Sequence, residues 1–460
     1  MLVEDLLADL ASSDSATRHA AVAAVRPDSF GPDAVGLLLG VLCDEGSPID
    51  WHDISRVLER LGDPVFEAVL TALHNPASDE VRRRLGGTFC TIRVSDFATT
   101  YGRTLRDEEP SIRAHSAYAF QFGREKAVPH AELLVPLLID PDEYVRRRAV
   151  WAFAELGSPV VPLLQEVRRS GGALRRPALT ALASAGGWDA VEPRDQAAVR
   201  RLIRVKLLND HPSPETWPDT GWFALPTGDQ KAVLAALDLS DAEPVTHRLG
   251  MSGVYTVPLG HRHRRCSWLY VTAEFDDWTL VFGTPPEMSG LHPERPGRWP
   301  GSLSDTEERA LRAQQQQLCL RLSEQFGRAY WYYSSTGDGV VGWCLAEAGQ
   351  LVRCYDSEWP EEAVGPPHPA EAGFRMPHDQ FDYPDGWFDG VNDGVGLRAR
   401  IQQYIRDYNV PPSCTPLAVA ERTSVNPATL GPHTRVRGHG VLALTECGRE
   451  NGIPRAAHRI

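Results

Sequence analysis

The sequence predicts a multi-domain chain: an all-α solenoid over residues 1–208, a linker at 209–221, and an α+β domain with a mainly antiparallel sheet over 222–460. Three observations predict this architecture. A helical pattern recurs about every thirty residues through roughly the first two hundred residues. A polar, proline-rich stretch, NDHPSPETWPDTG, then interrupts the pattern. Beyond it, short apolar runs alternate with turn residues, as strands and hairpins do.

The clearest helical unit runs from Asp140 to Gly157, DPDEYVRRRAVWAFAELG. Asp142 is placed to cap the helix, because its carboxylate can accept from the free N–H groups of the first turn. Gly157 suits a left-handed C-terminal stop. Apolar residues recur between them at steps of three and four, which is the buried stripe of a helix: Val145, Ala149, Ala152, Phe153 and Leu156.

A residue pair from this unit recurs along the first part of the chain. It consists of a β-branched residue followed by Arg, with one leucine variant: Thr17-Arg18, Val81-Arg82, Ile112-Arg113, Val145-Arg146 and Leu174-Arg175. Mostly small residues follow three and six positions after each Arg, and an acidic or polar residue usually precedes it by four, Gly171 being the exception. A period near thirty predicts a solenoid, because no single unit can bury its apolar stripe alone.

At these residues the chain resembles the HEAT repeats, in the short form also found in phycobilisome-lyase-like proteins, over about residues 1–207. The resemblance implies stacked helix pairs and a ladder of Asp–Arg interactions between successive units. It therefore implies a structural role first, and ligand binding second, for the recurring arginines: Arg18, Arg82, Arg113, Arg146 and Arg175. The C-terminal half resembles no family that we recognise.

Composition bounds the function. The net charge is −14 and both halves are acidic, which argues against binding a nucleic-acid backbone as the main task. Basic runs at 82–84, 146–148 and 200–201 keep a DNA-binding face open as an alternative. There is no run of 18 apolar residues, and the first residues carry acids where a signal peptide needs bases. We expect a cytoplasmic protein with no membrane partner, and the excess of arginine over lysine suggests a bacterium.

In the second half, three helices and several strands are predicted in order. Ser304 and Glu307 form a capping box at the start of the longest helix. Residues 360–396 form a loop-rich insertion rich in proline, glycine and acids. The predicted strands are 254–257, 268–272, 278–282, 329–334, 340–346, 350–355 and 440–445, and the predicted helices are 227–237, 304–327 and 397–408.

The candidate partner-binding residues come from both halves. The four adjacent aromatics 330–333 should alternate between the two faces of the sheet, so we expect at least two of them to lie outside the deep core. The candidates for contact with a partner are Arg82, Arg113, Arg146, Arg147, Tyr330 and Tyr332.

The candidate metal ligands lie in an acidic, glycine-rich loop: Asp385, Asp389, Asn392 and Asp393. A calcium loop needs carboxylates at alternating positions and a closing Glu, and neither is present here, so a surface loop is the favoured interpretation. His261, His263 and Cys266 are interleaved with three arginines, which favours a basic turn over a zinc site. The eight cysteines lie far apart without a CxxC, so we expect reduced, mostly buried thiols. No cofactor is predicted.

No nucleophile elbow, phosphate-binding loop or dinucleotide fingerprint occurs in the sequence, which favours a non-enzyme. The leading hypothesis is a protein–protein interaction scaffold or adaptor of a bacterial cytoplasm, of which an immunity-like role is one form. The first alternative is an enzyme or small-molecule-binding protein, with a site where the solenoid meets the α+β domain. The second alternative is a nucleic-acid-binding HEAT protein.

Overall fold

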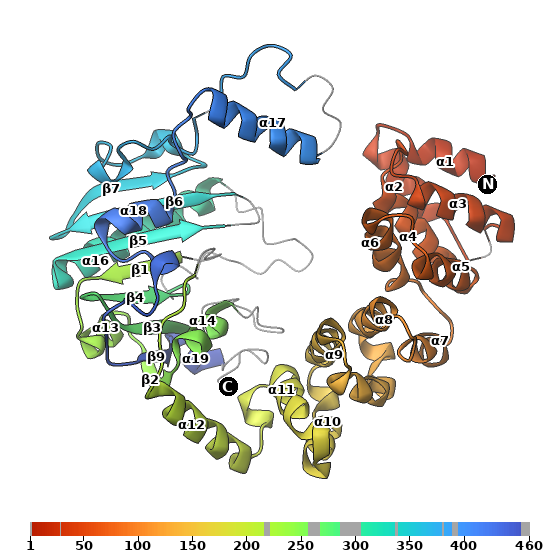
Figure 1. Ribbon diagram of the computed structural model, residues 1–460, viewed down its shortest axis with the longest axis horizontal. Helices are drawn as coiled ribbons and strands as arrows, with labels where there is room; N and C mark the ends of the chain where they lie inside the picture. Colours follow the sequence, from red (N-terminus) through yellow and green to blue (C-terminus); the bar gives the residue numbers. More distant parts are fainter. Residues whose placement is uncertain are drawn as a thin grey trace. The chain divides into compact units, whose positions relative to one another are not determined.

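Two compact units, Met1–Glu192 and Pro193–Ile460, make up the computed structural model; they are called unit 1 and unit 2 below (Figure 1). The structure describes residues 2–27, 29–215, 221–255, 267–285, 305–335, 339–379, 381–388 and 394–451.

Unit 1 is entirely helical. Its α-helices are α1 (Val3–Leu10), α2 (Ser15–Ala24), α3 (Pro32–Cys43), α4 (Trp51–Leu61), α5 (Asp63–His74), α6 (Asp79–Phe89), α7 (Phe97–Thr104), α8 (Pro110–Gly123), α9 (Glu143–Leu156), α10 (Val161–Ser170) and α11 (Arg175–Gly186). Unit 1 also contains five 3-10 helices among its described residues: η1 (Arg124–Lys126), η2 (Val128–Ile139), η3 (Ser158–Val160), η4 (Gly172–Leu174) and η5 (Trp188–Ala190).

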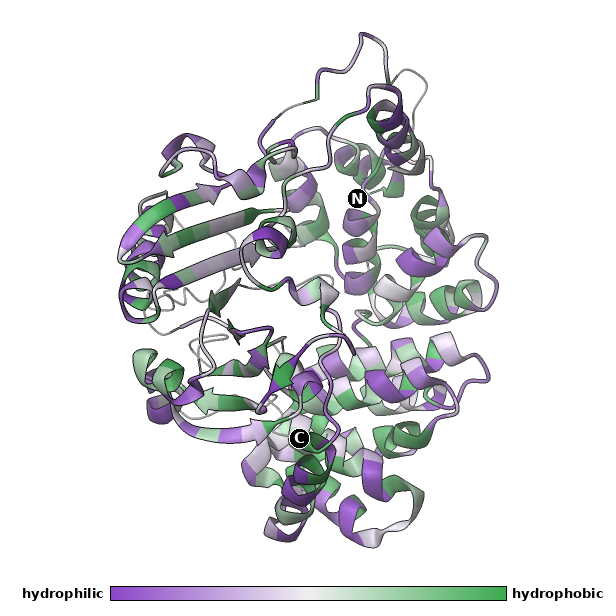
Figure 2. Ribbon diagram, turned by 60° about the vertical axis from the view of Figure 1, so that its left-hand side comes forward, coloured by the Kyte–Doolittle hydropathy of each residue, from purple (hydrophilic) through white to green (hydrophobic). Residues whose placement is uncertain are grey.

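Pairwise contacts join helices of unit 1 in one row: α2 contacts α4, α4 contacts α6, α6 contacts α8, α8 contacts α9, and α9 contacts α11. One continuous hydrophobic core runs through the row from Leu6 to Ala185. Figure 2 shows hydrophobic and hydrophilic segments mixed along these helices, as expected where each helix buries one side only. The predicted helical solenoid is confirmed.

Three arginines of the recurring pair bind backbone carbonyls in the preceding turn. Nη1 of Arg113 donates to the carbonyls of Asp107 and Glu108, at 2.9 Å each. Nη1 of Arg146 does the same with Asp140 and Pro141, and Nη1 of Arg18 with Ser12 and Ser13. The arginine therefore ties the inter-helix turn to its helix at each of these three repeats.

Two of these arginines also reach a carboxylate in the next unit, as the resemblance implies. Arg113 forms two hydrogen bonds of 2.8 Å with Asp140, and Nε of Arg18 lies 3.3 Å from Asp53. Arg82 differs, because its carboxylate contact, at 3.8 Å, is with Asp79 of its own helix.

Unit 2 is an α+β fold. Its strands are β1 (Gly221–Leu225), β2 (Ser240–Val245), β3 (Trp268–Phe275), β4 (Trp278–Phe282), β5 (Arg328–Ser334), β6 (Val341–Glu347), β7 (Gln350–Asp356), β8 (Val436–Arg437) and β9 (Gly440–Leu444). Its helices are α12 (Pro193–Leu207), α13 (Gln230–Ala236), α14 (His247–Tyr255), α16 (Asp305–Phe326), α17 (Gly394–Asp407), α18 (Pro416–Thr423) and α19 (Glu446–Asn451), with the 3-10 turns η6 (Pro360–Glu362), η7 (Pro369–Glu371) and η8 (Pro427–Thr429).

The strands of the described residues form one antiparallel sheet in the order β2-β9-β3-β4-β1-β5-β6-β7, with β8 paired to β3. α16 packs on β5, β6 and β7 over one face, whereas α14 and α18 pack over the other face (Figure 1). Separate hydrophobic cores lie on the two sides. The predicted antiparallel sheet with helices is confirmed, but both of its faces are covered.

The helices on the second face of the sheet correct one expectation, that at least two of the aromatic residues 330–333 on β5 lie outside the deep core. Tyr332 is fully buried, and its hydroxyl hydrogen-bonds Thr423 at 2.6 Å beneath α18. Tyr330 and Trp331 are 3% and 8% exposed, so only Tyr333 of the run lies outside the core. Alternation along a strand shows which side chains share a face, but not whether that face is covered.

Several predicted elements differ from the structure. Residues 254–255, predicted as part of a strand, end helix α14, and 256–257 lie outside the described residues. β1 and β2 were missed. β2 contains Asp241, Glu243 and Pro244, which are poor strand formers tolerated at a sheet edge. The predicted boundary at 208 places α12 in the solenoid, whereas the division into units places it in unit 2. α12 packs against β2, and Arg200 of α12 lies 3.6 Å from Glu243.

Candidate functional site

An arginine–aromatic surface lies on α8 and α9 of unit 1. It consists of Tyr118, Phe122, Tyr144, Arg147, Arg148 and Trp151. The guanidinium carbon of Arg148 lies 4.1 Å from the ring centroid of Tyr118, 5.0 Å from that of Tyr144 and 5.1 Å from that of Trp151. Arg148 also donates two hydrogen bonds to the Tyr144 hydroxyl, at 2.9 and 2.6 Å. These contacts hold the guanidinium in one place.

Helical periodicity explains how this surface arises. Residues 144, 147, 148 and 151 share one side of α9, opposite the stripe that begins at Val145 and is buried in the core. Tyr118 and Phe122 are one turn apart on α8, with ring centroids 4.7 Å apart, and α8 packs directly against α9. Three large side chains stay accessible here, with Phe122 51%, Trp151 45% and Tyr144 40% exposed.

Charge pairing distinguishes the arginines of this surface from Arg83, another arginine of unit 1 that lies beside an aromatic ring. Within the part of the chain that the structure describes, Arg147 and Arg148 contact no carboxylate. Arg83, by contrast, lies 4.9 Å from the Trp51 ring but is held by both oxygens of Glu80. Two uncompensated positive charges beside aromatic rings suit a negatively charged ligand.

His115 lies near this surface and lends it no charge at neutral pH. Burial, with the nearby charges of Arg148 and Arg82, lowers the pKa of His115 to about 4. Its ring packs against Gly86, where an added Cβ would lie 2.2 Å from the imidazole. The local positive potential therefore comes from the arginines alone.

The structure brings few of the predicted partner-binding residues together. Arg147 belongs to the arginine–aromatic surface. Arg113 and Arg146 are engaged in the turn contacts described above, Arg82 is half-buried, and Tyr330 and Tyr332 are in the core of unit 2. The buried tyrosines have no free surface to offer to a partner, because α18 and its neighbours cover that face of the sheet.

Sequence reasoning noted Arg148 only as part of a basic run and missed the four aromatic residues, yet a signal was present. Six residues after the first member of the recurring pair, the chain has Ala23, Gly87 and Thr180 in three units but Tyr118 and Trp151 in two adjacent ones. A large aromatic residue at a repeat position that is otherwise small marks a local surface feature.

Of the predicted metal ligands, Asp385 lies in an exposed turn; Asp389, Asn392 and Asp393 are outside the described residues, as are His261, His263 and Cys266. Within the described ranges, no group of three or more His, Cys, Asp and Glu side chains could hold a metal ion.

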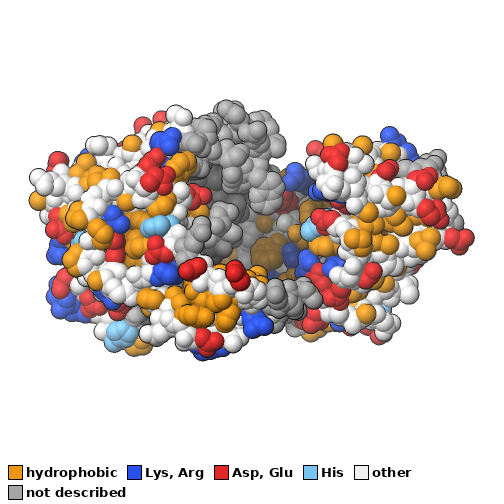
Figure 3. Space-filling view, turned by 90° about the horizontal axis from the view of Figure 1, so that it is seen from above, with side chains coloured by type: hydrophobic (Ala, Val, Ile, Leu, Met, Phe, Trp, Pro, Cys, Tyr) orange, Lys and Arg blue, Asp and Glu red, His pale blue; other side chains and the backbone are white. Residues whose placement is uncertain are grey.

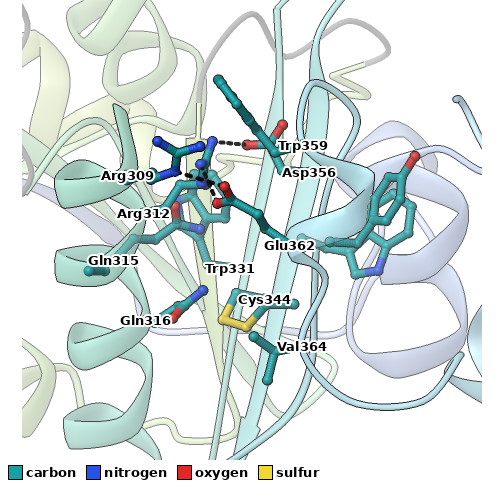
Figure 4. A pocket seen from close by; sticks show the side chains of 14 residues that line it. Arg309, Arg312, Gln315, Gln316, Trp331, Cys344, Asp356, Trp359, Glu362 and Val364 are labelled. Carbon is teal, nitrogen blue, oxygen red and sulfur yellow. Dashed lines mark hydrogen bonds and ion pairs between the residues drawn. A yellow bond between two sulfur atoms is a disulfide. The ribbon is translucent and has the colours of Figure 1, made fainter. Parts of the chain in front are cut away.

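Unit 2 contains a pocket of about 260 Å³ on the sheet face beneath α16 (Figure 4). Its floor is a row across three strands, because Trp331 pairs with Cys344 and Cys344 pairs with Cys354. Cys344 and Cys354 form a disulfide. The walls come from α16 and from the segment after β7, and their side chains include Arg309, Arg312, Gln315, Gln316, Asp356, Trp359, Glu362 and Val364.

The disulfide differs from the expectation of reduced thiols. The cysteines are ten residues apart, on strands joined by the turn at 347–350. Antiparallel register places them directly opposite each other, and this cannot be read from their spacing alone. Cys43, Cys90, Cys319 and Cys414 are free thiols.

The charges of the pocket pair with one another. Glu362 accepts from Nε of Arg309 at 2.7 Å and from Nη2 of Arg312 at 2.8 Å, and the hydrogen bond from Arg309 holds the pKa of Glu362 below its usual value. Asp356 lies 4.0 Å from Arg312, and burial raises its pKa. Both guanidinium groups also lie about 5 Å from the Trp359 ring, at 5.0 and 4.9 Å.

Comparisons with known proteins support the fold of unit 1. A family model described as HEAT repeats matches residues 102–183, which include α8, α9 and the arginine–aromatic surface. The N-terminal region is thus a HEAT-like solenoid. No curated protein matches the chain.

Solved structures also match. One, described as an engineered protein, is 18% identical with a TM-score of 0.20, and the match covers 40% of this chain and 96% of that one. A second engineered protein is 21% identical with a TM-score of 0.23, over 45% of this chain and 64% of its own length. Finally, no helix in the described ranges has both the length and the apolar character that crossing a bilayer requires.

Proposed function

We propose that unit 1 binds a protein partner through the arginine–aromatic surface, and that the chain acts as an interaction scaffold or adaptor. The observation that carries the proposal is Arg148, fixed among Tyr118, Tyr144 and Trp151 without a carboxylate partner in the described residues. HEAT-like solenoids offer extended surfaces of stacked helices, which suit protein binding.

The residue types of this surface and their fixed positions both favour protein binding. Tyr, Trp and Arg are the residues that contribute most to protein–protein binding energy. The rings and the guanidinium are already held together, so binding would immobilise few additional rotamers. Single exposed apolar residues are ordinary, but three adjacent exposed aromatics around two arginines form a cluster of the kind found at interfaces.

The chemistry of the surface favours an acidic partner segment that also carries an apolar side chain. Carboxylates of the partner would pair with Arg147 and Arg148, while the apolar side chain would pack on Trp151 and Phe122. An immunity-like role against a basic toxin would need an acidic surface instead, so this site does not support it. Figure 3 shows acidic and basic side chains interspersed on the visible face of each unit, which favours local recognition over long-range attraction.

The proposal can be tested with the full chain and a photo-crosslinking amino acid at Phe122, in lysate of the host with and without nuclease. We expect a specific protein adduct that survives nuclease treatment. The adduct should weaken at least about tenfold in Arg148→Ala and Trp151→Ala. The matched control is Arg176→Ala, which removes an exposed arginine of α11 outside the surface.

Equal adducts in all variants would reject the arginine–aromatic surface as the binding site. Loss of the adduct with nuclease would instead favour the nucleic-acid alternative, since arginine and aromatic rings also stack on exposed bases.

A further inference from the structure

Gln315 of α16 occupies a position where the helix pattern calls for an apolar residue. Leu311, Leu318 and Leu322 mark the stripe of α16 that faces the sheet, and Gln315 falls on the same stripe. It is only 7% exposed. A buried carboxamide normally has a hydrogen-bond partner, because leaving it unpaired costs free energy.

Within the described residues, the side chains of Gln315 and its neighbour Gln316 form no hydrogen bond with the protein. Both line the pocket between α16 and the segment that follows β7. In Figure 4 they extend from α16 across the pocket, toward the strands and the disulfide. Their donors and acceptors therefore face the pocket interior.

The charged side chains of the pocket are already paired with one another. Glu362 holds Arg309 and Arg312, and Asp356 lies beside Arg312. Two guanidinium groups and two carboxyls give the lining a net charge near zero. A charged ligand would need a free counter-charge to offset its desolvation, so the matched pairs favour a neutral ligand.

The remaining surface is apolar and flat. Trp331, Trp359 and the Cys344–Cys354 disulfide supply it. Binding sites for small molecules combine such apolar walls with a few converging polar groups. The volume of about 260 Å³ lies just below the range of roughly 300–1,000 Å³ that is typical for drug-sized ligands, which suits a compound built on one ring.

We propose that this pocket binds a small neutral molecule with a single ring and adjacent hydrogen-bonding groups, recognised by the carboxamides of Gln315 and Gln316. Monosaccharides and pyrimidine bases share this chemistry. The site belongs to unit 2 and is independent of the partner-binding surface proposed for unit 1.

The test is a ligand-observed NMR titration of the full chain with four neutral probes, glucose, galactose, uracil and cytosine, and with glucose 6-phosphate as the charged analogue. We expect saturable binding of at least one neutral probe. If it is glucose or galactose, the site takes sugars; if it is uracil or cytosine, it takes pyrimidine bases. Glucose 6-phosphate should bind more weakly than the sugar that binds in the first case, and not at all in the second.

The run of four glutamines in α16 supplies matched variants. Gln315→Leu should weaken binding of the positive probe about tenfold, because the ligand loses one buried hydrogen-bonding group. Gln317→Leu makes the same chemical change at an exposed position outside the pocket and should leave the affinity within about twofold. If Gln315→Leu fails to fold, Gln316→Ala takes its place.

Three results would overturn the proposal. One is the absence of binding by all four neutral probes at millimolar concentration. Another is tighter binding of glucose 6-phosphate than of every neutral probe. The last is an affinity that responds equally to changes at Gln315 and Gln317.

Discussion

Arg113 and Asp140 are joined by two hydrogen bonds of 2.8 Å, although 27 residues separate them in the sequence. Both side chains are largely shielded, with 12% and 6% of their surfaces exposed. The same Asp140 oxygen that accepts from Nη2 of Arg113 also accepts from the backbone N–H of Asp142, which caps α9. One carboxylate thus links the helix of one unit to the start of the next.

We therefore expect Arg113→Ala to lower the free energy of unfolding of unit 1 by about 2 kcal/mol, since it leaves a shielded carboxylate without its charged partner. Arg169→Ala is the control, because its ion pairs are exposed and such pairs contribute little. Urea titrations followed by circular dichroism would measure both. Equal midpoints for the two variants would contradict a structural role of the Arg113–Asp140 pair.

The same pair predicts how unit 1 responds to acid. Burial by itself would raise the pKa of Asp140, but the hydrogen bonds from Arg113 and from the Asp142 N–H outweigh it and lower the pKa. A lowered folded-state pKa stabilises the fold above the ordinary pKa of the group, and this contribution is lost as pH falls through the folded value. Asp140→Asn should flatten the decline of the unfolding midpoint below about pH 4, and an unchanged decline would contradict the assignment.

His247 predicts a pH effect in unit 2 at higher pH. It is 2% exposed, its Nδ1 lies 3.2 Å from the Tyr270 hydroxyl, and burial lowers its pKa to about 4. Between this value and the ordinary one, the unfolded chain binds the proton more readily, so stability rises with pH. We expect unit 2 to lose about 2–3 kcal/mol between pH 7 and pH 4 through this histidine.

Comparison with His247→Phe isolates that contribution. Asp210 lies beside His247, and burial raises its pKa, so it acts in the opposite sense in the acid range. The variant keeps Asp210 and removes only the imidazole. Urea titrations at pH 7, 6, 5 and 4 should give a shallower pH dependence in the variant than in the wild type. Identical slopes would show that folding does not lower the pKa of His247.

The Cys344–Cys354 disulfide can be tested by mass spectrometry. When the protein is denatured without reductant and treated with iodoacetamide, we expect Cys344 and Cys354 to stay unlabelled and to become labelled after reduction. Cys90, a free thiol, should be labelled in both samples. The double variant Cys344→Ser/Cys354→Ser should be less stable by about 2 kcal/mol, as expected for the loss of a short cross-link. Labelling of both cysteines before reduction would exclude the bond.

Gly365 supports the wall of the pocket through its backbone. It has a φ of +75°, and an added Cβ would lie 2.1 Å from the carbonyl oxygen of Val352. Gly373 has a similar φ of +82° but nothing within 4 Å of the added Cβ. We expect Gly373→Ala to cost about 1 kcal/mol through backbone strain alone. Gly365→Ala should cost at least twice as much, because β7 must also shift, and thermal melts of both variants measure the difference.

Local patterns predicted most of the secondary structure. The stripe of α9, the cap at Asp142 and the strands β3 to β7 follow from periodicity and turn residues, which act over short distances. β1 was not predicted, because its five residues directly follow a polar, proline-rich stretch. Its place between β4 and β5 is set by pairing with distant strands. The arginine–aromatic surface and the pocket of unit 2 were harder to predict from the sequence. The pocket needs residues from 309 to 364 in one place, and the burial of Tyr332 depends on α18.

The place of β9 has a consequence for how the chain is made. β9 begins at Gly440, yet it lies between β3 and β2, and β2 pairs with no other strand among the described residues. While the ribosome is still translating the residues before Gly440, β3 lacks a neighbour on one side and β2 lacks its only one. Open strand edges of this kind attract other nascent chains. The solenoid, built from contacts between neighbouring helices, can fold as it emerges. The sheet is completed only when β9 has been made, so its edges stay open for longer during synthesis.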